Sequence, residues 1–357
     1  MRPRHLVLAA LLVLVAYLAC WPVPVDPVAW EAPLNPGYTG AFAVDSTLRG
    51  FTPISLGAST APESVTRDAA GRIYATSAEG VIVRLTAEGT DPQVWARTGG
   101  RPLGLAFGPD GRLYVADGAR GLLAIDSTGV VEVLADSVDG HRLGFVDDLD
   151  VASDGRVYFS DASSKFVSGV RDVADPSVLD VIEHGAHGRL LEWDPVTRRA
   201  RVILAGVNFA NGVALDADER SVLLSETGAY RILRVVVTGP DRGTATPLLE
   251  ALPGFPDNIS RGRDGRFWVA LFAPRNALLD RLAGHPALRR VLVRVPKAVQ
   301  PKPREYAHII AIDASGRVLE DRQDPTGAFP KVTDVLETER WLYLGSLVAP
   351  TLARVPR

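Results

Sequence analysis

The sequence predicts an all-β fold, a six-bladed β-propeller that follows an N-terminal signal-anchor helix. Three observations favour this fold: a turn motif recurs six times, its spacing is nearly regular, and apolar residues alternate with polar ones on both sides of each copy. The copies centre on residues 71, 111, 155, 219, 265 and 339, at intervals of 40, 44, 64, 46 and 74 residues. A unit of about 40 to 46 residues, enlarged twice by insertions, is typical of radially repeated blades.

The first segment, residues 1–22, is predicted to be a signal anchor. Arg2 and Arg4 precede an unbroken apolar run over residues 6–21, and prolines then end any helix. A basic start before an apolar run is also typical of a cleaved signal peptide, but no Ala-x-Ala cleavage site follows, which favours retention. Acylation of Cys20 in a lipoprotein, or secretion after cleavage, are the alternatives. Because positive residues stay cytoplasmic, the rest of the chain is expected on the extracytoplasmic side, whether periplasmic, extracellular or lumenal.

The Pro-rich residues 23–40 predict an extended linker, and residues 41–357 are predicted to form the propeller. In the second repeat, four short apolar runs lie between residues 103 and 134, separated by turns rich in Gly and Asp, which is typical of strands joined by hairpins. An antiparallel sandwich is the alternative, disfavoured because Arg follows the turn mark at positions 72, 112, 156 and 266. The net charge of −3 argues against nucleic acid as a partner.

Two insertions, at residues 165–187 and 273–305, account for the enlarged intervals. Both are expected to connect the second and third strands of a blade, on the face where the first strands begin. They would therefore cover the centre of that face as a lid over a small apolar substrate. A decorative loop, or one resting on a membrane through its arginines, is the alternative. His184 and His187 in the first insertion are candidate proton carriers of this lid.

The first strand of each blade lines the central channel, so residues at equivalent strand starts should meet at one mouth. Eight residues before each mark stand Glu63, Leu103, Asp147, Asn211, Asp257 and Lys331. Four of the six carry carboxylate or amide oxygens, which would repel one another unless a cation or protons neutralised them. Oxygen ligands without Cys or His favour a hard ion such as Ca²⁺, and neighbouring Asn258 and Asp148 offer further oxygens. The alternative is that these residues only cap loops.

Lys331 complicates this ring, because its ammonium group would compete with a metal ion for the carboxylates. The turns of blades four and six are expected to be one residue longer than the others, so Asn211 and Lys331 carry a one-residue register uncertainty. If the register slips in blade six, Val332 faces inward instead. Leu103 is the apolar member of the ring.

Six longer motifs resemble those of a known family. They are residues 158–165, 188–195, 209–215, 225–228, 252–259 and 342–347. They occur in the order found in the strictosidine synthase-like family, and the chain is most similar to its membrane-anchored adipocyte plasma membrane-associated protein branch. The resemblance extends from about residue 40 to the C-terminus and implies a six-bladed propeller related to paraoxonases and to the gluconolactonase/senescence-marker group.

The resemblance also implies a ligand set. The catalytic calcium of paraoxonases would fall on Glu63, Asp147, Asn211, Asp257 and Asn258 of this chain. Three departures qualify it. Ser64 stands where the second paraoxonase calcium has an Asp, Leu103 replaces a histidine base, and residues 329–331 (Phe-Pro-Lys) lack the catalytic Glu of strictosidine synthase. A Pictet–Spengler condensation is therefore not expected.

Two functions from different classes remain. The first is a Ca²⁺-dependent esterase or lactonase acting on a small molecule, in which Asp257 activates water and the ion polarises the carbonyl. Its pocket or lid would include Leu103, Lys331, His184 and His187. The second is a non-catalytic, membrane-anchored propeller that binds a ligand or protein, favoured by Leu103 and Lys331.

Overall fold

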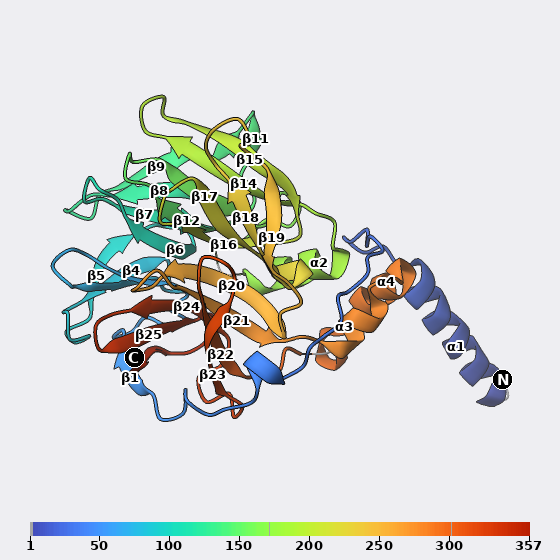
Figure 1. Cartoon of the computed structure of the whole chain (residues 1–357). Helices are drawn as coiled ribbons and strands as arrows, with labels where there is room; N and C mark the ends of the chain where they lie inside the picture. The colour runs from blue at the N-terminus through green and yellow to red at the C-terminus, as the bar shows by residue number, and fades with distance from the viewer. Residues whose placement is uncertain (1–2, 171, 301) are drawn as a thin grey trace.

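The computed structural model describes residues 3–170, 172–300 and 302–357. Six four-stranded antiparallel sheets surround a central axis, so the predicted six-bladed propeller is confirmed (Figure 1). In five blades the first strand in sequence, and in the sixth blade the strand that begins at Val332, lies at one edge of the sheet and contacts the equivalent strands of the neighbouring blades. The innermost strands of all blades therefore converge on the axis.

The blades follow the order of the sequence. Blade 1 contains β2 (Val65–Arg67), β3 (Ile73–Ala75), β4 (Val81–Leu85) and β5 (Gln93–Arg97). Blade 2 contains β6 (Pro102–Phe107), β7 (Leu113–Asp117), β8 (Gly121–Ile125) and β9 (Val131–Ala135), and the hairpin β10 (Ser137–Val138) and β11 (His141–Arg142) follows it. Blade 3 contains β12 (Val146–Val151), β13 (Val157–Asp161), β14 (Gly188–Asp194) and β15 (Arg199–Val207).

Blade 4 contains β16 (Ala210–Leu215), β17 (Ser221–Glu226), β18 (Arg231–Val236) and β19 (Ala245–Leu249), with the short 3₁₀ helix η2 (Thr227–Ala229) after β17. Blade 5 contains β20 (Gly254–Arg261), β21 (Phe267–Pro274), β22 (Ala307–Ile312) and β23 (Val318–Asp324). Blade 6 contains β24 (Val332–Glu337), β25 (Trp341–Ser346), β26 (Thr351–Pro356) and, from the other end of the chain, β1 (Thr52–Ser55).

Strand β1 closes the ring, which the sequence did not predict. The C-terminal part of the chain supplies only β24, β25 and β26 to blade 6, so the outer edge of this blade is open until β1 pairs with β26. Ile54 of β1 is buried with Val65 of blade 1 and Leu352 of β26. The N-terminal strand thus holds the first and last blades together and covers an exposed sheet edge.

Shortening Ile54 tests this closure. Ile54→Ala is expected to lower the free energy of unfolding by about 2–5 kcal/mol, because a buried β-branched side chain leaves a cavity. Thr52→Ala in the same strand is the matched control, because Thr52 is exposed and should change little. Denaturant unfolding of both variants measures the difference; an Ile54→Ala protein as stable as the control would contradict the role given to β1.

In three of the four turns, the recurring arginine pairs with an aspartate of its own hairpin, whereas Arg266 pairs with Glu320 of β23. Arg72 Nε lies 2.7 Å from Asp68 Oδ2, Arg112 Nε lies 2.6 Å from Asp110 Oδ2, and Arg156 pairs with Asp154. These pairs are mostly exposed, so each contributes little to stability. Their repetition instead reflects a common turn geometry on the face of the propeller opposite the lid.

The helices gather at one end of the propeller. They are α1 (Pro3–Cys20), α2 (Ala174–Glu183), α3 (Ala277–Leu282), α4 (Pro286–Arg294) and the 3₁₀ helices η1 (Gly40–Phe42) and η3 (Lys297–Val299). As expected from the sequence, one insertion joins β13 to β14 and the other joins β21 to β22, the second and third strands of their blades. We call α2, α3 and α4 the lid helices; in Figure 1 they lie between the propeller and α1.

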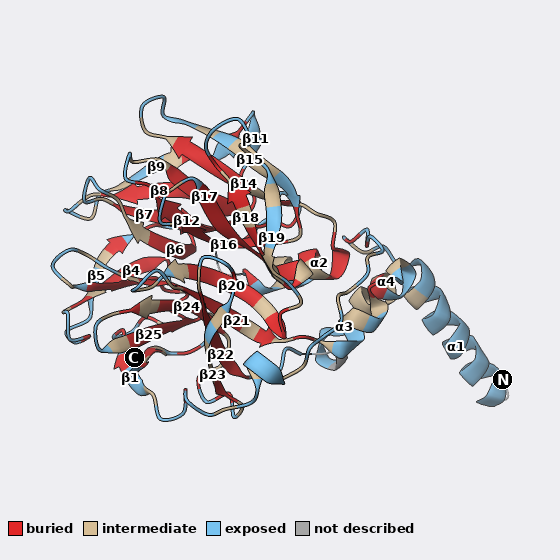
Figure 2. Cartoon of the chain, in the orientation of Figure 1, coloured by how far each residue is buried: buried red, intermediate tan, exposed pale blue. Residues whose placement is uncertain are grey.

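Helix α1 is apolar and has no buried residue, whereas the blade strands around the axis are largely buried (Figure 2). By length and composition it is the one helix of the described residues that is able to cross a membrane. The following segment, residues 21–50, runs back along the lid helices to the propeller, and we call it the N-terminal arm.

Candidate functional site

Two consecutive residues near the start of each inner strand face the axis region. In five blades the pairing between the first and second strands shifts across these two residues, and in blade 1 the equivalent pair directly precedes Val65. The first members form what we call the inner ring: Glu63, Leu103, Asp147, Asn211, Asp257 and Thr333. The second members form the outer ring: Ser64, Gly104, Asp148, Gly212, Asn258 and Asp334.

The inner ring is the floor of a large cavity. All six of its residues line this space of about 1170 Å³, and residues of α2, α3 and α4 line the opposite wall. The segments before the first strands and the two insertions therefore meet across one cavity. Its volume slightly exceeds the range of about 300–1,000 Å³ that is common for ligand pockets, so it has room for a small organic molecule.

The structure corrects the expected ring at one position, since Thr333 and not Lys331 is the blade 6 member. Val335 pairs with Leu344, nine residues later, whereas the equivalent Ile259 pairs with Val269, ten residues later. The blade 6 hairpin is thus one residue shorter, not longer, and its mark at residue 339 lies one residue early relative to β25, so counting back eight residues overshoots by two. Thr333 Oγ1 donates a hydrogen bond of 2.5 Å to the Glu63 carbonyl, so it also joins blade 6 to blade 1.

The carboxylates of the inner ring are buried close to one another. Burial, together with the charges of Asp147 and Asp257, raises the pKa of Glu63 well above its usual range. Burial and Asp257 likewise raise the pKa of Asp147. Burial, opposed by a hydrogen bond from Asn211, raises the pKa of Asp257 to about 7. The three groups therefore repel one another when all are ionised, and a cation between them would relieve that repulsion.

Several oxygens of the two rings lack a donor. Glu63 Oε2, Asn211 Oδ1 and Asn258 Oδ1 are buried and accept no hydrogen bond. Leaving such acceptors unsatisfied costs about 1–3 kcal/mol each, and a hard cation would satisfy all of them at once. Glu63 Oε1 accepts a bond of 3.0 Å from Asn258 Nδ2, which holds this carboxylate at the floor.

The donor set fits calcium in its chemistry, because it consists of carboxylate and amide oxygens. Within residues 3–170, 172–300 and 302–357, however, no three His, Cys, Asp or Glu side chains converge into a metal-ligand group by themselves. An ion held here would therefore draw on the amide oxygens of Asn211 and Asn258 as well as on the inner-ring carboxylates.

The outer ring connects neighbouring blades. Asp148 Oδ2 accepts a hydrogen bond of 2.8 Å from Val213 N in blade 4. Asp334 Oδ2 accepts bonds of 2.8 and 2.9 Å from Ser64 Oγ and Val65 N in blade 1. These carboxylates are satisfied by the backbone of the next blade, so they place the inner ring and are not free ligands. Sequence counting missed Asp334 because it missed the register of blade 6.

Gly212 shows how closely the inner strands approach. A Cβ added to this residue would lie 2.4 Å from Ile259 N and 2.6 Å from the Asp257 carbonyl oxygen. Gly212→Ala is thus expected to push away the strand that carries Asp257 and to cost about 1–3 kcal/mol of stability. Gly284→Ala between α3 and α4 is the control, because a Cβ there meets no atom within 4 Å. Equal melting temperatures for the two variants would contradict this packing.

Two cations also line the cavity. Arg101 is only 3 % exposed, and its Nη1 has no hydrogen-bond partner. Burial lowers its pKa, while Glu63, Glu79, Asp117 and Asp147 act in the opposite direction. Lys331 lies at the rim, where its Nζ stands 5.9 Å from the centre of the Phe272 ring. Arg101 does not follow from the sequence repeat, because it lies two residues before the ring position of its blade.

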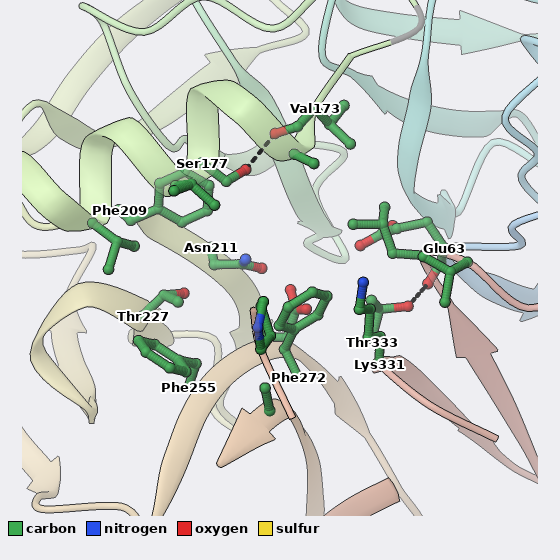
Figure 3. A pocket seen from close by; sticks show the side chains of 18 of the residues that line it. Glu63, Val173, Ser177, Phe209, Asn211, Thr227, Phe255, Phe272, Lys331 and Thr333 are labelled. Carbon is green, nitrogen blue, oxygen red and sulfur yellow. Dashed lines mark hydrogen bonds between the residues drawn. The ribbon is translucent and has the colours of Figure 1, made fainter. Parts of the chain in front are cut away.

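The rest of the floor and wall is apolar. Leu103 packs with Phe145, Val173 and Phe209 beside the carboxylates. Figure 3 shows Phe209 and Phe255 near Asn211, with Phe272, Lys331 and Glu63 on the other side of the cavity. The cavity thus combines a polar centre with apolar walls, which is the usual composition of a small-molecule site.

His184 and His187 do not line the cavity, contrary to their expected place in the pocket. The His184 ring stacks on Trp30 of the N-terminal arm at 3.9 Å, and burial, Arg289 and Arg231 lower its pKa to about 3. It is therefore neutral near pH 7. His187 Nε2 lies 2.6 Å from Glu183 Oε1, and Lys165 contacts the same carboxylate. Both histidines belong to the contacts that hold the lid helices.

Comparisons with known proteins agree with this architecture. Residues 40–85 match the family model for the strictosidine synthase-like N-terminal region, and residues 147–240 match that for strictosidine synthase. An adipocyte plasma membrane-associated protein from Salmo salar is 35 % identical over 93 % of this chain and 84 % of its own length. Strictosidine synthase-like protein 6 from Arabidopsis thaliana is 32 % identical over 84 % of this chain and 80 % of its own.

Solved structures share the fold at lower identity. A gluconolactonase from Xanthomonas campestris superposes with a TM-score of 0.62 at 17 % identity, covering 94 % of this chain and 99 % of its own. The calcium-binding protein regucalcin from Agrobacterium tumefaciens superposes with a TM-score of 0.57 at 14 % identity. This match covers 85 % of this chain and 93 % of regucalcin. These neighbours are gluconolactonase- and regucalcin-like propellers. The sequence matches over most of the chain show that it belongs to the strictosidine synthase-like family, with adipocyte plasma membrane-associated proteins among its relatives.

Proposed function

We propose that the protein is a calcium-dependent hydrolase of ester or lactone bonds, with its propeller on the extracytoplasmic side of a membrane. The observation that carries this proposal is the set of buried acceptor oxygens without donors on Glu63 and Asn211, at the floor of the cavity, and on Asn258, which contacts Glu63. The gluconolactonase and calcium-binding neighbours of the same fold support it.

Glu63, Asp147, Asn211, Asp257 and Asn258 would hold the ion. Bound there, calcium supplies a Lewis acid that polarises the substrate carbonyl and stabilises the developing oxyanion. The chain's own part is to position the ester above the floor: Phe145, Phe209 and Phe272 bound its apolar portion. The lid helices exclude bulk water, which strengthens electrostatic interactions in the site.

Asp257 is the residue proposed to take a proton from the attacking water. It lines the cavity, and its strand β20 belongs to the blade whose β21–β22 insertion carries α3 and α4. Asn211 orients the Asp257 carboxylate through a hydrogen bond. Leu103, the inner-ring residue of blade 2, has no acid–base group. Asp257 must therefore take the proton without help from a second base in that blade.

Metal removal tests the proposal. The full chain, purified in detergent, is expected to hydrolyse a phenyl ester or a simple lactone with added calcium, to lose that activity in excess chelator, and to regain it when calcium is restored. Turnover that is indifferent to chelator contradicts the metal role. Absence of turnover on both substrate classes, with a melting temperature unaffected by calcium, contradicts the hydrolase assignment.

The cations favour a second candidate function, a membrane-anchored propeller that binds a ligand without catalysis. Arg101 and Lys331 place positive charge around the same carboxylates and so oppose metal binding. Under this alternative, substitution of the inner-ring carboxylates leaves ligand binding at the cavity intact. The chelation experiment separates the two candidates.

A further inference from the structure

The membrane helix is attached to the lid and not to the side of the propeller. Arg294 at the end of α4 donates hydrogen bonds of 2.6 Å to the Trp21 carbonyl and 3.0 Å to the Leu18 carbonyl, at the end of α1. The Tyr17 hydroxyl in turn donates to the Arg294 carbonyl at 3.0 Å. Tyr17 and exposed Trp21 are the aromatic residues typical of the membrane–water boundary. This places the end of α4 at that boundary when α1 crosses the bilayer.

The N-terminal arm makes this attachment rigid. Val28 N donates a hydrogen bond of 2.9 Å to the Glu183 carbonyl, and the Trp30 ring stacks on the His184 ring. The arm therefore contacts the end of α2. Arg289 of α4 is 2 % exposed and donates to the carbonyls of Val28, Ile182 and Ala283. One buried guanidinium thus joins the arm, α2 and the α3–α4 turn, so the orientation of the lid relative to α1 is defined by packed contacts.

The mouth of the cavity carries apolar side chains that face solvent. Val170, Val178, Leu278 and Val348 each line the cavity, and each is between 42 % and 49 % exposed. They come from the two insertions and from the β25–β26 loop, so they surround one opening. An exposed apolar rim of this kind marks an interaction surface. Leu292 of α4, the helix that holds α1, lines the same cavity, so the bilayer is the partner that this rim would meet.

We propose that this lidded face lies on the lipid surface and that the cavity admits its substrate from the membrane. In Figure 1 the order along the molecule is propeller, lid helices and α1, so the mouth opens on the side of the bilayer. The substrate class is then an amphiphile whose apolar chain resides among the lipids and whose ester or lactone group reaches the inner ring. The substrate class rests on the proposed function, whereas the membrane contact does not.

Fluorescent labelling tests the membrane contact. Cys20 is the single cysteine, so Cys20→Ser gives a background in which one new cysteine can be labelled. Leu278→Cys reports on the rim, and Val196→Cys, 87 % exposed in the β14–β15 turn on the opposite face, is the matched control. Both full-length proteins are labelled with an environment-sensitive dye and reconstituted in phosphatidylcholine vesicles containing a lipid with a nitroxide near its headgroup.

The expected result is quenching and a blue-shifted emission at position 278, with neither change at position 196. Similar emission at both positions, or quenching at 196 alone, overturns the membrane contact. Near-equal melting temperatures of the two variants exclude misfolding as the source of a difference.

The substrate class is tested with two esters of the same alcohol, one short-chain and water-soluble, one long-chain and dissolved in the vesicles. We expect vesicle-bound protein to favour the long-chain ester in kcat/KM, and to lose that preference in detergent. Equal preference in both media overturns the substrate class. Quenching at position 278 without hydrolysis of either ester contradicts the proposed function and supports the membrane contact.

Discussion

Replacing Asp257 by asparagine is expected to lower kcat for ester hydrolysis by about 10²–10⁴-fold, the usual contribution of a positioned general base. The amide keeps the shape and one oxygen of the side chain but does not accept the proton of the attacking water. Asn211 already holds this side chain at the floor, so the substitution should leave the cavity in place. The rate is measured at saturating calcium, which separates the loss of the base from weaker ion binding.

Asp218→Asn is the control for this substitution, because Asp218 is exposed in the β16–β17 turn, on the face opposite the lid. It should hydrolyse the ester at the wild-type rate. If Asp257→Asn also keeps that rate, Asp257 is not the base. A loss that disappears when calcium is raised further would make Asp257 a ligand alone.

Asp147→Asn is expected to have opposite effects on stability with and without calcium. In chelator, the substitution removes one buried carboxylate that burial and Asp257 already disfavour as an anion. We expect a gain of about 1–3 kcal/mol in the free energy of unfolding, the scale of an uncompensated buried polar group. With calcium present the wild type should gain about 2.7 kcal/mol at an ion concentration of 100 Kd, and the variant, with a weakened site, should gain much less.

Thermal unfolding of both proteins in chelator and in calcium measures the two effects. Asp218→Asn again serves as the control and should follow the wild type in both media. An Asp147→Asn protein that is less stable than wild type in chelator and equally stabilised by calcium would show that the cluster is held together by contacts among its own residues.

The propeller could be predicted from sequence because its signal is local. The Asp-Gly turns and alternating apolar residues repeat within each hairpin, and turn chemistry of this kind depends on adjacent residues. Strand β1 carries no such mark. It is four residues long, and its pairing with β26 joins residues about 300 positions apart, as Thr52 opposite Arg354 shows. Only the open edge of blade 6 explains why this segment becomes a strand.

The candidate site was predictable as far as the hairpins kept a constant length. Five inner-ring residues follow from the repeat, whereas Thr333 and Asp334 do not, because the blade 6 turn is one residue shorter and its mark lies one residue early. The roles of Arg101, Arg289 and Trp30 depend on contacts between distant segments: Arg289 alone joins residues 28, 182 and 283. No periodicity in the sequence reports such contacts. A reactive residue type can also be misleading: the sequence predicts His184 as a proton carrier, but its side chain is buried against Trp30.

Calcium binding to the metal-depleted full chain, measured by titration calorimetry, tests the central claim most directly. The inner ring predicts one ion per chain, with Glu63→Gln weakening the affinity by roughly tenfold or more, the scale seen when a group supporting a metal site is lost. Ser55→Ala, exposed on β1, should bind like the wild type. If the wild type releases or absorbs no heat on calcium addition, or if Glu63→Gln leaves the calcium affinity unchanged, the metal site at the floor of this cavity is contradicted.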